Sequence, residues 1–201
     1  MALISLFENN YEKTLVWVLI GVFLDSFDGL VARAFRATTE IGKQLDSLCD
    51  VISFGVVPGY FMYKYLSDFL PYELVPLSLL AFVVTLASIY RLARFNITPS
   101  SQLDFQGMPT PAFALFVIGI PFIPYEINPI IIIVIVVLLT VLMVSKIMLP
   151  SQKFVNGKPS NFFWIFAVIS IPTLLIFSSQ ALSLTVLSYA VFGMLYMRLK
   201  A

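Results

Sequence analysis

Four aspartates lie close together in the first quarter of the chain, within a stretch that is otherwise largely apolar. Asp25 and Asp28 are three residues apart, and Asp46 and Asp50 are four apart. In an α-helix, side chains at these spacings share one face. Two neighbouring antiparallel helices would therefore direct two carboxylates each into one volume, and four such groups cannot all stay ionised without cations between them. Oxygen ligands suit Mg²⁺, Mn²⁺ or Ca²⁺, so the spacing predicts a divalent-cation site with room for two ions.

Small and basic residues surround these aspartates. Gly29 and Ala32 lie beside Asp28, and Gly42 comes one turn before the second aspartate pair. Small residues let helices approach closely or leave room for a ligand, and plain helix packing would also explain them. Arg33 can pair with an anion held by the metals. Metal ions together with an arginine commonly bind the phosphate groups in phosphoryl-transfer enzymes. A polar network without a ligand, or a cation pathway, is the alternative interpretation of the aspartates.

The composition places these charges in a membrane protein. Of the 201 residues, 60% are hydrophobic and 11% are charged, whereas soluble domains average about 45–50% and 25%. The high hydrophobicity excludes disorder, and a net charge of +1 argues against nucleic-acid binding. A single cysteine, Cys49, excludes a disulfide scaffold. Because the chain has no histidine, acid–base or metal chemistry must use carboxylates, Lys, Tyr or this thiol.

The elements that must hold the aspartates are transmembrane helices. We expect an all-α polytopic membrane helix bundle with about seven transmembrane helices, forming a single domain over residues 1–201. A span needs roughly 20 mostly apolar residues. The aspartate pairs fall on the first two of the seven segments that qualify, which are 14–36, 42–66, 72–95, 109–125, 127–147, 161–178 and 181–198.

The basic residues support this number of spans. With seven spans, the connections alternate between two sides of the membrane, and one side collects ten of the twelve Lys and Arg residues. The positive-inside rule assigns that side to the cytoplasm. We therefore expect a multi-pass protein of the cell membrane whose site opens to the cytoplasm. The ten residues are Arg33, Arg36, Lys43, Arg91, Arg94, Lys146, Lys153, Lys158, Arg198 and Lys200.

The complete motif resembles the signature of the CDP-alcohol phosphatidyltransferase family. Eight fixed residues occur between positions 25 and 50, in the order Asp25-x2-Asp28-Gly29-x2-Ala32-Arg33-x8-Gly42-x3-Asp46-x3-Asp50, and all eight match that signature. The resemblance implies an integral membrane enzyme that displaces CMP from a CDP-linked lipid or alcohol. A homodimer also follows from the resemblance.

The resemblance further implies roles for individual residues. The four aspartates would hold two Mg²⁺ or Mn²⁺ ions that bind the diphosphate of the CDP group, and Asp50 would also be the general base for the acceptor hydroxyl. Lys43, one turn before Asp46, is a candidate phosphate ligand, with placement at the membrane interface as the alternative. The complete set of predicted CDP-binding residues is Asp28, Gly29, Ala32, Arg33, Gly42 and Lys43.

Three downstream blocks resemble the CDP-diacylglycerol–serine O-phosphatidyltransferases of that family, namely residues 50–59, 91–96 and 105–112. The resemblance implies CDP-diacylglycerol and L-serine as substrates. The serine carboxylate needs an arginine or a helix N-terminus. Arg91 and Arg94 could supply the arginine, and Asn96, the third predicted serine-binding residue, could orient either of them. The alternative for both arginines is ordinary anchoring at the membrane interface.

Two alternatives to this function remain open. The same chemistry could serve glycerol 3-phosphate, inositol phosphate or choline, and a cation transporter could also use four aspartates. A transporter predicts repeats with broken helices in both halves, yet residues 113–201 contain no carboxylate within a predicted span. Because relatives carry a further helix before the motif, we also expect the first helix of the family core to be missing from residues 1–24.

Overall fold

The structure is a computed structural model, and it describes residues 1–34, 39–97, 105–125, 127–150, 154–155, 158–159 and 181–200. Within these ranges it leaves out the side chains of 26, 28–34, 105, 154–155, 158–159 and 199–200. The predicted span 161–178 lies outside the described residues. The chain divides into two compact units, Met1–Thr98 and Pro99–Ala201, and each is described by itself. The prediction of a single domain stays a prediction.

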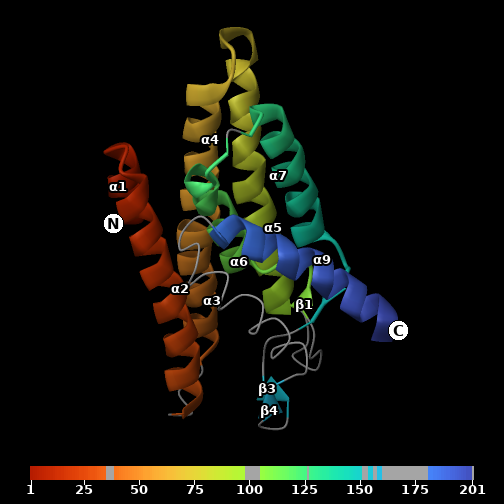
Figure 1. Ribbon diagram of the computed structural model, residues 1–201. Helices are drawn as coiled ribbons and strands as arrows, with labels where there is room; N and C mark the ends of the chain where they lie inside the picture. The colour runs from red at the N-terminus through yellow and green to blue at the C-terminus, as the bar shows by residue number, and fades with distance from the viewer. Residues whose placement is uncertain are drawn as a thin grey trace. The chain divides into compact units, whose positions relative to one another are not determined.

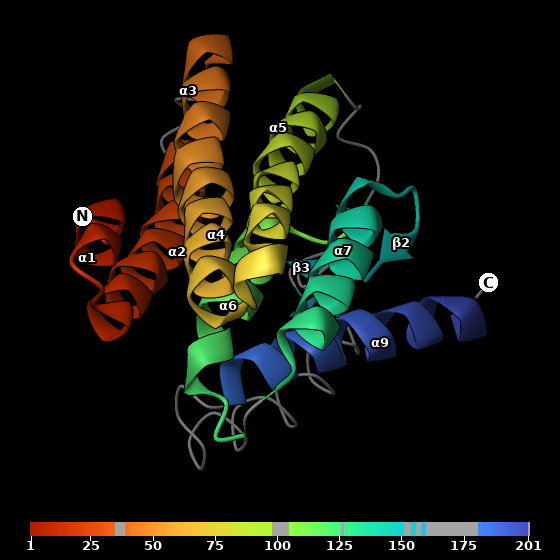
Figure 2. The ribbon, with the colours of Figure 1, turned by 90° about the horizontal axis from the view of Figure 1, so that it is seen from above.

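The first unit is entirely helical in its described part. The short helix α1 (Ala2–Phe7) packs on the long helix α2 (Tyr11–Ala34). The next three elements, α3 (Glu40–Val51), η1 (Ile52–Val56) and α4 (Val57–Phe69), form one continuous rod. The last two, η2 (Tyr72–Ala81) and α5 (Phe82–Ile97), form a second rod. Figures 1 and 2 show α5 alongside the α3–η1–α4 rod.

The second unit also consists mainly of helices. Helix α6 (Thr110–Gly119) leads into η3 (Ile120–Phe122) and contacts both α7 (Pro129–Val144) and α9 (Leu182–Lys200). Two-residue strands form two antiparallel pairs: β1 (Phe105–Gln106) with β2 (Met148–Leu149), and β3 (Phe154–Val155) with β4 (Lys158–Pro159). These pairs are too short to change the class of the fold.

The lengths of the helices and their exposed apolar side chains indicate a membrane protein. Among the described residues, Glu40–Phe69 and Tyr72–Ile97 are long and apolar enough to cross a bilayer, by length and composition. Helix α7 exposes large apolar side chains over its whole length, among them Ile130, Val134 and Leu138. Water-soluble proteins rarely expose such a continuous apolar surface. The prediction of an all-α membrane helix bundle is confirmed.

Within the described residues, six of the predicted spans coincide with helices to within a few residues at each end, and the segment 127–147 is one of those that extend beyond the helix. Helix α7 ends at Val144. The Ser145 hydroxyl donates to the Leu142 carbonyl at 2.8 Å and accepts from the Ile147 N–H at 3.2 Å. A serine that binds backbone groups in this way competes with the next helical turn, so the chain turns into strand β2 instead.

The rod that carries two of the aspartates changes its winding directly after them. Element η1 is a π-helical turn that begins two residues after Asp50. Pro58 has no N–H, so a carbonyl of the preceding turn loses its helical donor, and π-turns absorb such interruptions. The Gly55 carbonyl accepts a hydrogen bond from Thr85 Oγ1 of α5 at 3.0 Å. A Cβ added to Gly55 would lie 3.0 Å from the Ser88 Cβ, so this glycine lets α5 approach closely.

The other end of the first unit is held by a separate set of polar contacts. Lys64 Nζ donates to the Leu6 carbonyl at 3.1 Å, which ties α4 to the end of α1. The Tyr11 hydroxyl forms a hydrogen bond with Asp68. These contacts lie at the C-terminal end of α4, away from the predicted aspartate site at the start of the rod.

Candidate active site

Three of the four predicted aspartates come together in the first unit. Asp25 lies on α2, and Asp46 and Asp50 lie one turn apart on α3. The carboxyl groups of Asp25 and Asp50 form a hydrogen bond, and Asp46 interacts electrostatically with Asp50. Thr39 is the N-cap of helix α3, and its hydroxyl accepts from the Gly42 N–H at 3.0 Å. The expected convergence of α2 and α3 on one volume is therefore present in the described residues.

A buried arginine from a third helix faces this group. Arg91 of α5 is only 6% exposed, and it interacts electrostatically with Asp50. Arginine stays protonated in proteins, so its charge offsets the repulsion between converging carboxylates. Arg91, one of the two arginines predicted to bind the acceptor, therefore lies near Asp50.

Arg94 lies in a different environment. Its guanidinium carbon is 6.0 Å from the centroid of the Tyr90 ring, one turn earlier on α5. This is the outer limit of a cation–π contact. Its predicted role in serine binding stays a prediction.

The remaining signature residues lie partly outside the described structure. Asp28, Gly29, Ala32 and Arg33 belong to the last turns of α2, and their side chains are not described. Gly42 lies in the first turn of α3, and a Cβ added there would meet the Thr39 hydroxyl at 3.0 Å. The capping contact of this turn thus accounts for a small residue at position 42, and its predicted role in the nucleotide pocket stays a prediction.

The described side chains include three of the four predicted metal ligands, Asp25, Asp46 and Asp50. Among the described side chains, which do not include Asp28, no group of three or more acidic, cysteine or histidine side chains is arranged to hold a metal ion. The donors present are carboxylate oxygens, which are the ligands that hard divalent ions such as Mg²⁺ and Mn²⁺ prefer. The chemistry of the donors therefore fits the predicted ions.

Two predicted ligands, Lys43 and Asn96, contact each other at the start of α3. Lys43 Nζ donates to the Asn96 backbone carbonyl at 2.9 Å. Asn96 Nδ2 donates to Ser47 Oγ at 2.8 Å and to Gln44 Oε1 at 3.4 Å. Ser47 Oγ in turn lies 3.1 Å from the Lys43 carbonyl, to which it donates. We call these four residues the α3–α5 clasp.

Sequence reasoning missed Ser47 and Gln44 as members of this group. Both lie on the polar side of α3, and Lys43 and Ser47 are four residues apart. That spacing marks a shared helix face. It does not reveal which neighbouring helix the face meets, so the partner on α5 could not be found from the sequence.

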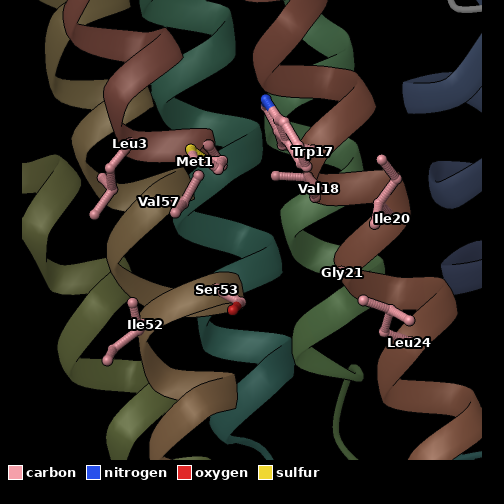
Figure 3. A pocket seen from close by; sticks show the side chains of 11 residues that line it. Met1, Leu3, Trp17, Val18, Ile20, Gly21, Leu24, Ile52, Ser53 and Val57 are labelled. Carbon is pink, nitrogen blue, oxygen red and sulfur yellow. The ribbon is translucent and has the colours of Figure 1, made fainter.

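An apolar pocket lies beside the aspartates in the same unit. It has a volume of about 270 Å³ and lies between α1, α2, η1 and the start of α4, as Figure 3 shows. Leu24 immediately precedes Asp25, and Ile52 and Ser53 follow Asp50 closely in the chain. The pocket offers almost no polar groups. The complete lining is Met1, Ala2, Leu3, Trp17, Val18, Ile20, Gly21, Leu24, Ile52, Ser53 and Val57.

The sequence comparisons assign this arrangement to a family. Residues 1–144 match the profile described as CDP-alcohol phosphatidyltransferase, and this range contains α2, α3 and α5 with all the aspartates and Arg91. The chain belongs to the CDP-alcohol phosphatidyltransferase family. The predicted resemblance is thus confirmed, and the cation-transporter alternative loses its support because the family consists of enzymes.

Several curated members of the CDP-alcohol phosphatidyltransferase family align over most of the chain. A CDP-diacylglycerol–serine O-phosphatidyltransferase of Bacillus subtilis is 33% identical over 153 residues, or 76% of this chain and 83% of the relative. The protein of that name from Methanocaldococcus jannaschii is 34% identical over 180 residues, or 89% and 81%. That from Helicobacter pylori is 30% identical over 206 residues, or 97% and 85%.

Proposed function

We propose that this enzyme transfers the phosphatidyl group of CDP-diacylglycerol to the hydroxyl of L-serine, forming phosphatidylserine and releasing CMP. The observation that carries the proposal is the meeting of Asp25 and Asp50 from two helices beside the buried guanidinium of Arg91. The printed names of the relatives support serine as the acceptor.

Asp50 is the proposed general base. It accepts the proton of the serine hydroxyl, whose oxygen then attacks the phosphorus that carries the diacylglycerol. The new oxygen–phosphorus bond replaces the bond from that phosphorus to the bridging oxygen, and CMP leaves with the bonding electron pair. A positioned base of this kind contributes typically 10²–10⁴-fold to a rate. Asp25, hydrogen-bonded to Asp50, holds the carboxyl of the base in place.

Arg91 is the proposed ligand of the serine carboxylate. A guanidinium can bind a carboxylate through two parallel hydrogen bonds, and burial strengthens such a contact because water does not compete for it. Binding at Arg91 would bring the serine hydroxyl next to Asp50, since the arginine and the aspartate already interact. Arg94, on the same helix, remains a second candidate.

Asp25, Asp28, Asp46 and Asp50 are the proposed ligands of two divalent ions, Mg²⁺ or Mn²⁺. When bound, such ions neutralise the charge of the diphosphate and stabilise the leaving group. Gly29, Ala32, Arg33, Gly42 and Lys43 are proposed to bind the CDP group together with Asp28. The site is proposed to open to the cytoplasm, because ten of the twelve basic residues fall on that side of the predicted topology. The homodimer stays a prediction.

An acceptor panel tests the proposal. The purified full chain is given CDP-diacylglycerol, Mn²⁺ or Mg²⁺, and one alcohol at a time: serine, glycerol 3-phosphate, inositol phosphate or choline. We expect release of CMP with serine alone, and no release after the divalent ions are removed with a chelator. Release with glycerol 3-phosphate and not with serine would overturn the acceptor and leave the transfer chemistry intact. Full activity in the chelator would overturn the metal dependence.

A further inference from the structure

Side-chain hydrogen bonds join helix α5 to the α3–η1–α4 rod at two separate points, which we call the fastening points. At one end, Asn96 contacts Lys43, Gln44 and Ser47 through the α3–α5 clasp. At the other end, Thr85 Oγ1 donates to the Gly55 carbonyl in η1. Thr85 and Asn96 are eleven residues apart, which is three helical turns, so both fastening points lie on one face of α5.

Arg91 lies between these two points but is not on that face. It is six residues from Thr85 and five from Asn96, so at 100° per residue Arg91 points roughly 120–140° away from that face. Its long side chain is nevertheless buried and interacts with Asp50 of the rod. The rotation of α5 about its own axis therefore decides whether Arg91 faces the carboxylates, and two fastening points on one face fix that rotation.

The hydrogen bonds of the α3–α5 clasp hold the two helices in a fixed position. The Asn96 amide nitrogen donates to two side chains of α3, and the Lys43 ammonium donates to a carbonyl in the last turn of α5. A cation at the C-terminal end of a helix is favourable, because the free carbonyls there carry negative partial charge. Asn96 thus has its amide engaged with the protein, which favours a connecting role over contact with a substrate.

We propose that Asn96 and Ser47 are positioning residues whose hydrogen bond sets the rotation of α5 and so holds Arg91 opposite Asp50 for binding of the acceptor carboxylate. This inference rests on the proposed function, and it assigns Asn96 an orienting role through the position of α5 rather than direct binding of serine. The acceptor site is then sensitive to a polar contact more than one helical turn away from Arg91 along α5.

The experiment compares Asn96→Ala, Ser47→Ala and the double variant with the wild-type chain, at saturating CDP-diacylglycerol and varied serine. Each single variant is expected to raise the KM for serine by about tenfold, the size of one misplaced hydrogen-bonded contact, with the KM for CDP-diacylglycerol unchanged. The double variant should be no worse than Asn96→Ala alone, because that substitution already removes the bond between Asn96 and Ser47. Ser67→Ala is the matched control: it removes a serine–serine hydrogen bond of 3.1 Å between α4 and η2 and should leave both KM values unchanged.

An exchange of the two side chains separates positioning from direct binding. The variant Ser47→Asn with Asn96→Ser can form the same bond in reverse, and it should recover most of the wild-type KM for serine. A wild-type KM in Ser47→Ala together with an impaired Asn96→Ala would overturn the inference, since Asn96 would then act alone as a ligand. Additive effects without rescue would also overturn it.

Failure of the proposed function would be visible separately. If the wild-type chain releases CMP with another anionic alcohol instead of serine, the acceptor assignment fails, and the same variants are compared by the KM for that alcohol. A raised KM with rescue by the exchanged pair would support the positioning role there too, and equal KM values would overturn it.

Discussion

In the first unit, α5 is held against its neighbouring rod at two points by side-chain hydrogen bonds, whereas in the second unit α6 packs mainly through buried apolar side chains, with one hydrogen bond from Ser183 and one close contact at Gly119. Phe113, Ala114, Val117 and Ile118 of α6 have no exposed surface. The α3–α5 contact includes Asn96, whose amide and backbone bind three residues of α3.

The difference between the two interfaces has a physical basis. Apolar side chains can slide past one another at little cost, but hydrogen bonds and close glycine contacts permit only one register. The first unit must align carboxylates from two helices with an arginine from a third. We therefore expect substitutions in the first unit to change catalytic constants, and substitutions in the second unit to change stability alone.

The largest effect is expected for Asp50→Asn, because it removes the proposed base and a metal ligand together. CMP release should fall by at least 10³-fold, within the range for loss of a general base. Assays of CMP release at matched amounts of folded protein measure it. Asp68→Asn is the control, since this carboxylate binds Tyr11 at the other end of the unit; a similar loss there would show that the effect is not specific to the site.

The second largest effect is expected for Arg91→Ala, which should weaken binding of serine. Loss of a charge-assisted bidentate contact is expected to raise the KM for serine by about 100-fold, and to change the KM for CDP-diacylglycerol far less. Arg94→Ala should have the smaller effect, because this arginine lies over Tyr90. Steady-state kinetics with each substrate varied in turn distinguish the two arginines, and the reverse order would move the acceptor site to Arg94.

Gly→Ala variants in the two units should differ in how far a second substitution restores their stability. In Gly59→Ala the new Cβ would meet the Thr85 hydroxyl, and overpacking of this kind costs about 1–3 kcal/mol of stability. Adding Thr85→Ala removes the obstructing hydroxyl and should restore stability, apart from the loss of the hydrogen bond from Thr85 to the Gly55 carbonyl. In Gly119→Ala the Cβ would meet both the hydroxyl and the backbone nitrogen of Ser183, so Ser183→Ala should rescue only partly. Thermal unfolding in detergent measures both, and equal rescue at the two sites would contradict the comparison.

The smallest effect is expected for Ser183→Ala alone in the second unit. The buried Ser183 hydroxyl donates to the Phe116 carbonyl at 2.7 Å, and loss of one such bond costs about 1 kcal/mol. The melting temperature should fall by a few degrees while the KM and kcat of the folded enzyme stay the same. A changed KM would mean that the second unit also positions the substrate.

The sequence alone determined the class of the molecule and the identity of its reactive groups. Apolar length and scarce charge predict membrane helices, because a bilayer admits few other structures. The helical repeat places Asp25 with Asp28, and Asp46 with Asp50, since spacing within one helix is a local property. The motif also predicted the family that the comparisons confirmed.

Only the tertiary structure decided which of these groups meet. Arg91 and Arg94 are three residues apart on one helix and equally basic, yet packing buries Arg91 beside Asp50 and leaves Arg94 over Tyr90. Asn96 faces Ser47 for the same reason. The rotation of one helix against another depends on contacts such as Gly55 with Ser88, which join residues far apart in the chain and leave no periodic pattern in the sequence.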